Sequence, residues 1–191
     1  MQDEHIVESV LGGDIQAFEL LVLKYQKPVF RSVLSILKNE AEAEDITQEA
    51  FVKAYEKLST LQNRAGFYAW IKRIGINLAL NQYDKNKWMV DVTSDNTEYD
   101  FFDNVPVYQT PEGEILKDEL KKYIKLFIDS LPEKLRLVLV LREIDELSYE
   151  DISEMLKIPV GTVRSRLFNA RQILKDRLLK QGLADELSRV N

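Results

Sequence analysis

Apolar residues recur at every third or fourth position in two long stretches of this chain, residues 5–87 and 114–180. Between them, residues 88–113 hold six acids, two prolines and no Lys or Arg, and their apolar residues follow no period. An irregular segment of this length is too long for a connection inside a compact domain. Neither stretch alternates apolar and polar residues as a half-buried strand does. The sequence therefore predicts an all-α fold of two small helical domains, at 5–87 and 114–180, joined by an acidic flexible linker at 88–113 and followed by a tail at 181–191.

The scarcity of Cys and His narrows the chemistry available to the chain. Its 191 residues include no Cys and one His, His5. These residues cannot form a disulfide, a thiolate zinc site or a multi-histidine metal site, and a single His near the start of the chain argues against a Ser–His–Asp triad. The 7 Gly and 5 Pro are few, which favours helix over turn-rich β structure. Asp and Glu side chains could still serve an enzyme, so composition makes catalysis only the less favoured interpretation, and we assign no catalytic, cofactor-binding or metal-binding residues.

Neither the start of the chain nor its longest apolar run suggests a membrane. The sequence begins MQDEH, which is acidic where a signal peptide needs positive charge. The longest strictly apolar run, residues 137–141, is far shorter than the ~20 residues that a transmembrane helix needs. We therefore expect a cytoplasmic protein with no membrane insertion of its own. The net charge of −6 argues mildly against a nucleic-acid partner, but charge has to be considered face by face.

Residues 148–171 have the outline of a helix-turn-helix. Ser148 with an acid three residues later is typical of a helix start, and residues 158–161 read as a turn. A seam of Val163, Leu167, Ala170, Leu174 and Leu178 then predicts a long last helix. Residues 161–180 carry six basic residues and one acid, a local net charge of +5. Arg and Asn at the start of such a helix can bond base edges, and later Lys and Arg can reach phosphates. The pattern predicts DNA recognition, with a solvated basic face as the alternative.

Residues 64–87 combine basic and aromatic side chains. Five basic residues and one acid give a local net charge of +4. We expect the buried seam of this helix to be formed by Phe67, Ile71, Ile74 and Leu78. Basic groups interleaved with the rings of Phe67, Tyr68, Trp70, Tyr83 and Trp88 suit the binding of unpaired bases. The alternative is that these rings are core residues, as we expect for Phe67.

The helix predicted at 41–58 leaves an acidic side exposed. Ile46, Ala50, Ala54 and Leu58 form its apolar stripe, and Asp45, Gln48, Glu49 and Val52 lie opposite. Such a face is most often solvated, and it can also dock a basic partner.

Four motifs taken together resemble the bacterial extracytoplasmic-function (ECF) RNA polymerase sigma factors, group 4 of the sigma-70 family. The motifs are AEDITQEAF at 43–51, FYAWIKRI at 67–74, LPEK at 131–134 and VGTVRSR at 160–166. They occur in the family's order, and the resemblance covers nearly all of residues 5–180. It implies a sigma region 2 domain, a linker and a sigma region 4 domain. Such proteins are not enzymes; they bind core RNA polymerase and direct it to −35 and −10 promoter elements.

The resemblance also implies a role for particular residues. Contacts to polymerase, at its β′ clamp, fall on Asp45, Gln48, Glu49 and Val52. Contacts to the −10 element, with a flipped base near Asn77 and residues 61–66, fall on Arg64, Lys72, Arg73, Asn77, Asn81 and Lys85. Contacts to −35 DNA fall on Arg164, Ser165, Arg166, Phe168, Asn169, Arg171 and Lys175. Asn169 departs from several relatives, which carry Arg there, so the −35 sequence read by this chain is open.

The family also implies partners and competing interpretations. The partners are core RNA polymerase, through its β′ clamp and β flap, promoter DNA, and an anti-sigma factor. A stand-alone helix-turn-helix regulator would need a ligand-sensing or dimerising domain, which the sequence does not suggest. A carboxylate- or metal-dependent nuclease would need acids clustered beside a basic groove, whereas the acids here lie in the linker or at helix starts.

Overall fold

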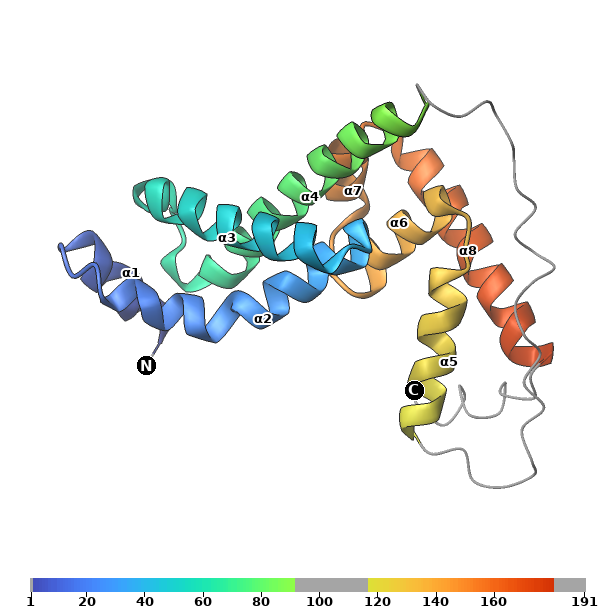
Figure 1. The fold of residues 1–191 in the computed structure, drawn as a ribbon, viewed down its shortest axis with the longest axis horizontal. Helices are drawn as coiled ribbons and strands as arrows, with labels where there is room; N and C mark the ends of the chain where they lie inside the picture. Colours follow the sequence, from blue (N-terminus) through green and yellow to red (C-terminus); the bar gives the residue numbers. More distant parts are fainter. Residues whose placement is uncertain (1, 92–116, 181–191) are drawn as a thin grey trace. The chain divides into compact units, whose positions relative to one another are not determined.

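The computed structural model describes residues 2–91 and 117–180, and throughout these ranges the regular structure is helical (Figure 1). This confirms the all-α prediction for the described part of the chain. The chain separates into two compact units, residues 1–95 and 96–191. The linker and tail that we predict lie outside the described residues, except for 88–91, which continue a helix.

The first unit contains four α-helices and two short 3-10 helices. In chain order they are α1 (Asp3–Leu11), α2 (Ala17–Leu37), α3 (Glu40–Glu56), η1 (Leu58–Thr60), η2 (Arg64–Gly66) and α4 (Phe67–Asp91). The turn between α1 and α2 depends on Gly13, whose φ of 105° is a conformation that other residues rarely adopt. Asp14 then accepts a hydrogen bond from the Ala17 amide at the start of α2, and Asn39 caps α3 by accepting from the Glu42 amide.

A half-buried carboxylate, Asp3, links helix α1 to α2. Asp3 accepts hydrogen bonds from Lys24 Nζ at 2.6 Å and from the Tyr25 hydroxyl. Partial burial raises the pKa of Asp3, but the hydrogen bonds from Lys24 and Tyr25 outweigh it and leave this pKa below the ordinary 3.8. The contribution of Asp3 to stability is therefore complete above pH 3.8 and is lost as the pH falls through the lowered pKa.

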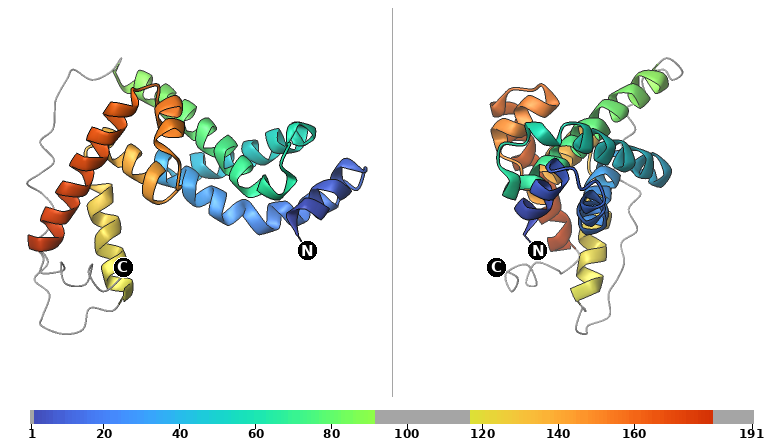
Figure 2. Two further views of the ribbon diagram at one scale, coloured as in Figure 1. Left: turned by 180° about the vertical axis from the view of Figure 1, so that it is seen from behind. Right: turned by 90° about the vertical axis from the view of Figure 1, so that its left-hand side faces the viewer.

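Helices α2, α3 and α4 pack side by side, as both views of Figure 2 show, and bury the core of the first unit. At the crossing of α2 and α4, a Cβ added to Gly75 would lie 3.1 Å from Val29 Cγ1 and 3.4 Å from Val33 Cγ2. Gly75 thus lets the two helix backbones approach more closely than any larger residue would permit.

The predicted seam of α4 is correct for its first turn and wrong beyond it. Phe67 and Ile71 are fully buried, but Ile74 and Leu78 are only half-buried. The buried side continues instead through four other residues, Gly75, Ile76, Ala79 and Leu80. Close packing of α2 against Gly75 sets the buried side, and that side also carries the large residues Ile76 and Leu80. Apolar spacing along α4 alone does not distinguish it from the predicted side. The helix also continues to Asp91, past the predicted end near residue 87, because no Gly or Pro occurs between Gly75 and Pro106.

The second unit contains the predicted helix-turn-helix. Its helices are α5 (Lys117–Asp129), α6 (Glu133–Glu143), α7 (Tyr149–Leu156) and α8 (Val160–Lys180). Ser148 caps α7, since its hydroxyl accepts from the Asp151 amide at 3.0 Å, as the sequence predicts. Lys157, in the left-handed conformation with φ 52°, ends α7 and turns the chain toward α8. Phe127 of α5 packs with Leu174 and Leu178 at the far end of α8.

We predict that Gly75→Val destabilises the first unit by about 1–3 kcal/mol, the usual cost of overpacking, because its methyl groups would overlap Val29 and Val33. Urea unfolding followed by circular dichroism measures this. Gly161→Ala in α8 is the control, because nothing lies within 4 Å of an added Cβ there, and it should not destabilise. An unchanged unfolding midpoint for Gly75→Val would contradict the close approach of α2 and α4.

Candidate functional site

The outer side of α8 presents most of the residues that we predict for duplex DNA. The seam predicted from the sequence is confirmed at Val163, Leu167, Ala170 and Leu178, which are buried, whereas Leu174 is half-buried. Arg166 is half-buried, and the other predicted residues are exposed: Arg164, Ser165, Phe168, Asn169, Arg171 and Lys175. The exposure of Phe168 reaches 67%, which is unusual for a large apolar side chain on a helix that has a well-formed core side. We call this surface the α8 face.

Arg171 on the α8 face is held by a residue that sequence reasoning missed. Its Nε and Nη2 both donate to Oε1 of Glu143, the last residue of α6, at 3.1 and 2.5 Å. The hydrogen bond to Glu143 raises the pKa of the Arg171 guanidinium, with Tyr149 contributing in the same direction. No spacing in the sequence relates residues 28 positions apart on different helices, so only the packing of α6 on α8 reveals this pair.

The exposed side of α3 is arranged as the sequence predicts. Asp45, Gln48, Glu49 and Val52 are all exposed, with Val52 at 57%. Glu49 forms an ion pair with Lys53 at 2.7 Å, one turn along the helix. We call this surface the α3 face.

A hollow between α2 and α3 borders the α3 face. It is lined by two carboxylates and two amides together with a lysine, a threonine and an aromatic ring: Gln26, Lys27, Phe30, Glu40, Glu44, Thr47 and Gln48. The α2 residues of this hollow were not predicted from the sequence, because only the packing of α2 against α3 brings them beside Gln48.

The residues that we predict for the −10 element are spread along α4. Asn77, Asn81 and Lys85 are exposed, and Lys72 and Arg73 are half-buried. Lys72 Nζ lies 5.8 Å from the centre of the Tyr68 ring. Asn77 is ten residues beyond the start of α4 at Phe67, a rise of roughly 15 Å along the helix axis.

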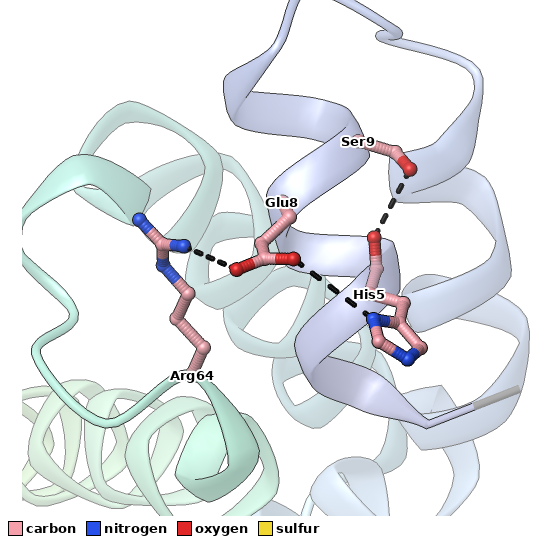
Figure 3. A network of polar contacts seen from close by, with 4 residues as sticks. All are labelled: His5, Glu8, Ser9 and Arg64. Atoms are coloured by element: carbon pink, nitrogen blue, oxygen red, sulfur yellow. Dashed lines mark hydrogen bonds and ion pairs between the residues drawn. The ribbon is translucent and has the colours of Figure 1, made fainter.

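Arg64, the remaining predicted −10 residue, is tied to α1 (Figure 3). Its Nη1 donates to Oε1 of Glu8 at 2.6 Å. His5 Nδ1 lies 3.9 Å from the other Glu8 oxygen, and Ser9 Oγ donates to the His5 carbonyl at 3.0 Å. The loop before α4 is therefore braced by the first helix of the chain, a contact that the sequence did not indicate.

The aromatic side chains of α4 mostly contact one another and α2. Phe67 is fully buried and lies edge-on to Phe18, with the ring centres 6.3 Å apart. Tyr68 stacks on Tyr25 at 4.9 Å, and half-buried Trp70 packs against Phe67 at 6.0 Å. Among the described aromatic residues of α4, Phe67 is therefore a core residue, as predicted. One face of the Tyr68 ring is already covered by Tyr25.

Comparison with known proteins places both units in one family. Sigma-70 region 2 matches residues 21–89, and Sigma-70 region 4 matches residues 121–174. The RNA polymerase sigma-H factor of Pseudomonas aeruginosa is 41% identical over 177 residues, which cover 91% of this chain and 92% of that protein. The ECF RNA polymerase sigma-E factor of Haemophilus influenzae is 37% identical over 182 residues, which cover 93% of this chain and 96% of that protein.

Two solved structures share the fold. CnrH, in complex with the cytosolic domain of CnrY, has a TM-score of 0.55 at 21% identity and covers 93% of this chain and 97% of that one. The sigma factor RpoE of Bartonella quintana, in complex with the anti-sigma factor NepR, has a TM-score of 0.55 at 22% identity and covers 84% of this chain and 96% of that one.

The chain therefore belongs to the sigma-70 family of RNA polymerase sigma factors. Within that family it is an ECF sigma factor, a transcription initiation factor that directs RNA polymerase to promoters, rather than a stand-alone regulator. In the described ranges, 2–91 and 117–180, no helix is long and apolar enough to cross a membrane.

Adjacent residues of α8 provide a test of how this helix is oriented. Leu167→Ala removes a buried side chain and should lower the free energy of unfolding by about 2–5 kcal/mol. Phe168→Ala removes an exposed one and should change it by less than about 0.5 kcal/mol. Denaturant unfolding of both variants measures the difference, and the reverse order would show that α8 is rotated.

Proposed function

We propose that this sigma factor binds its partners through three separate exposed surfaces. The α8 face recognises −35 duplex DNA, α4 and the loop before it bind the −10 element, and the α3 face docks on the β′ clamp of core polymerase. The single observation that carries this proposal is the α8 face, where a fully formed helix-turn-helix buries its seam and leaves arginine, asparagine and an aromatic ring exposed together.

The α8 face supports −35 recognition because its side chains suit the major groove. Arg164 and Asn169 have the planar donor groups that pair with guanine and adenine edges. Phe168 offers an apolar contact of the kind that thymine methyl groups accept. Lys175, two turns further along α8 than Phe168, suits a phosphate, which fixes register without reading sequence.

The −10 role rests on the exposed amides of α4. Asn77 and Asn81 lie one turn apart on the exposed side of the helix, where each can bond the edge of a base that has left the stack. Unstacking a base costs a few kcal/mol, which such contacts would offset. Because the described rings of α4 are buried or half-buried, we expect hydrogen bonds, more than ring stacking, to hold the base.

The α3 face supports docking on polymerase because its exposed polar and apolar groups lie together. Gln48, Glu49 and Val52 sit within about one turn of each other, and the neighbouring hollow adds Glu40 and Glu44. This combination suits a partner helix that is basic and partly apolar. The second unit would contact the β flap of the same enzyme.

An anti-sigma factor completes the set of partners that we propose. In the solved structures of similar fold, RpoE is bound to the anti-sigma factor NepR, and CnrH is bound to the cytosolic domain of CnrY. A regulator that binds both units through one tether would gain effective concentration, so modest contacts could add up to tight inhibition. We place the protein in the cytoplasm, where core polymerase acts.

A pair of variants separates docking from promoter opening. Glu49→Lys reverses the charge of an exposed residue, so it should abolish co-elution with core polymerase while changing unfolding by less than about 0.5 kcal/mol. Asn77→Ala should preserve co-elution but reduce permanganate reactivity of the −10 region, because it removes amide contacts to a base. Each variant is the control for the other. Normal core binding by Glu49→Lys, or normal opening by Asn77→Ala, would contradict the assignment of that surface.

A further inference from the structure

We infer that Glu143 is a positioning residue for promoter recognition, because it holds the Arg171 guanidinium so that only one edge of it faces DNA. This inference deepens the proposed function and rests on the −35 role of the α8 face. It gives Arg171 a directed contact with a guanine edge instead of a mobile contact with any nearby phosphate.

The geometry of the pair leaves one edge of the guanidinium available. Arginine has five N–H donors arranged as a planar fork. Glu143 Oε1 accepts from Nε and from Nη2, at 3.1 and 2.5 Å, and thereby occupies the side edge of the group. Glu143 does not use the terminal edge, which is formed by Nη1 and the second hydrogen of Nη2; the Tyr149 side chain also interacts with the guanidinium. Two parallel donors on that edge match the O6 and N7 acceptors of guanine.

The carboxylate is itself held in place by the fold. Glu143 ends α6, whose residues Leu137 and Leu141 are buried. The neighbouring Arg142 is engaged with its own surroundings, since its Nη1 donates to the Leu147 carbonyl at 2.8 Å and its guanidinium lies 5.2 Å from the Tyr149 ring centre. Because a supporting group on a rigid element positions a contact better than one on a loop, Glu143 can fix the direction of Arg171.

The charge of Glu143 changes what Arg171 contributes to binding. A free guanidinium attracts any phosphate, which increases affinity for all sequences and makes binding more sensitive to salt. Paired with a carboxylate, Arg171 adds little net charge and contributes chiefly through hydrogen bonds. The side chains of Arg171 and Glu143 remain 52% and 48% exposed, and exposed pairs contribute little to folding. We therefore expect the pair to affect recognition more than stability.

The test uses the full-length protein bound to core polymerase and a duplex promoter fragment mapped from transcript 5′ ends. Binding is measured by fluorescence anisotropy for the native −35 element and for each single-base substitution, over a series of salt concentrations. Glu143→Ala should reduce discrimination at one G·C position by about tenfold, the effect of losing one bidentate contact. It should also steepen the slope of log K against log salt by about one unit.

Two controls make the result specific. Glu150→Ala removes the same charge from an exposed position on α7 and should leave base discrimination unchanged. In an Arg171→Ala background, Glu143→Ala should have no further effect on discrimination, because the group that it positions is absent. Urea unfolding of each variant shows that the fold is retained.

The outcomes separate this inference from the function on which it rests. If Arg171→Ala reduces discrimination at one position and Glu143→Ala leaves the whole profile unchanged, or lowers affinity equally for all sequences, the positioning role is wrong and the −35 role stands. If Arg171→Ala itself leaves the profile unchanged, the −35 contact of Arg171 is wrong, and the inference falls with it.

Discussion

The close approach of α2 and α4 at Gly75 sets the geometry of the first unit. With Val29 and Val33 packed against the position where a side chain would begin, α4 has one orientation that fits. That orientation buries Phe67, Ile71 and Ala79 and leaves Asn77 and Asn81 exposed. Packing at a glycine thus determines which polar residues of α4 reach the solvent, and in the function that we propose these residues meet the −10 base.

In the second unit, too, the packing of buried residues determines which residues are exposed. The seam of α8 settles against α6 and α7, and its burial turns Arg164, Phe168 and Asn169 outward. An exposed phenylalanine contributes little to folding, and in the function that we propose its place beside Arg164 and Asn169 serves DNA binding. In both units, apolar packing on one side of a helix determines which residues are exposed on the other side, where we propose that they bind.

The sequence was informative wherever a single helix carried the signal. The α8 seam, the Ser148 cap and the exposed side of α3 follow from spacing along one chain segment and are confirmed. Beyond its first turn, the buried side of α4 differs from the prediction, because it is set by the packing of α2 against Gly75, which spacing along α4 does not reveal. The pairs that hold Arg64 and Arg171 could not be predicted, since Glu8 and Glu143 come from helices distant in sequence. Local periodicity predicts faces, whereas the orientation of a charged group depends on tertiary contacts.

The central claim is that three surfaces of one sigma factor meet three different partners, and site-specific photo-crosslinking tests it most directly. A photoreactive amino acid is placed at Val52, Asn77 or Phe168, each of which is exposed, and the protein is assembled with core polymerase on a promoter. The account predicts crosslinks from Val52 to the β′ subunit, from Asn77 to the −10 strand and from Phe168 to the −35 duplex. Crosslinks from Val52 to DNA, or from Phe168 to polymerase alone, would contradict it.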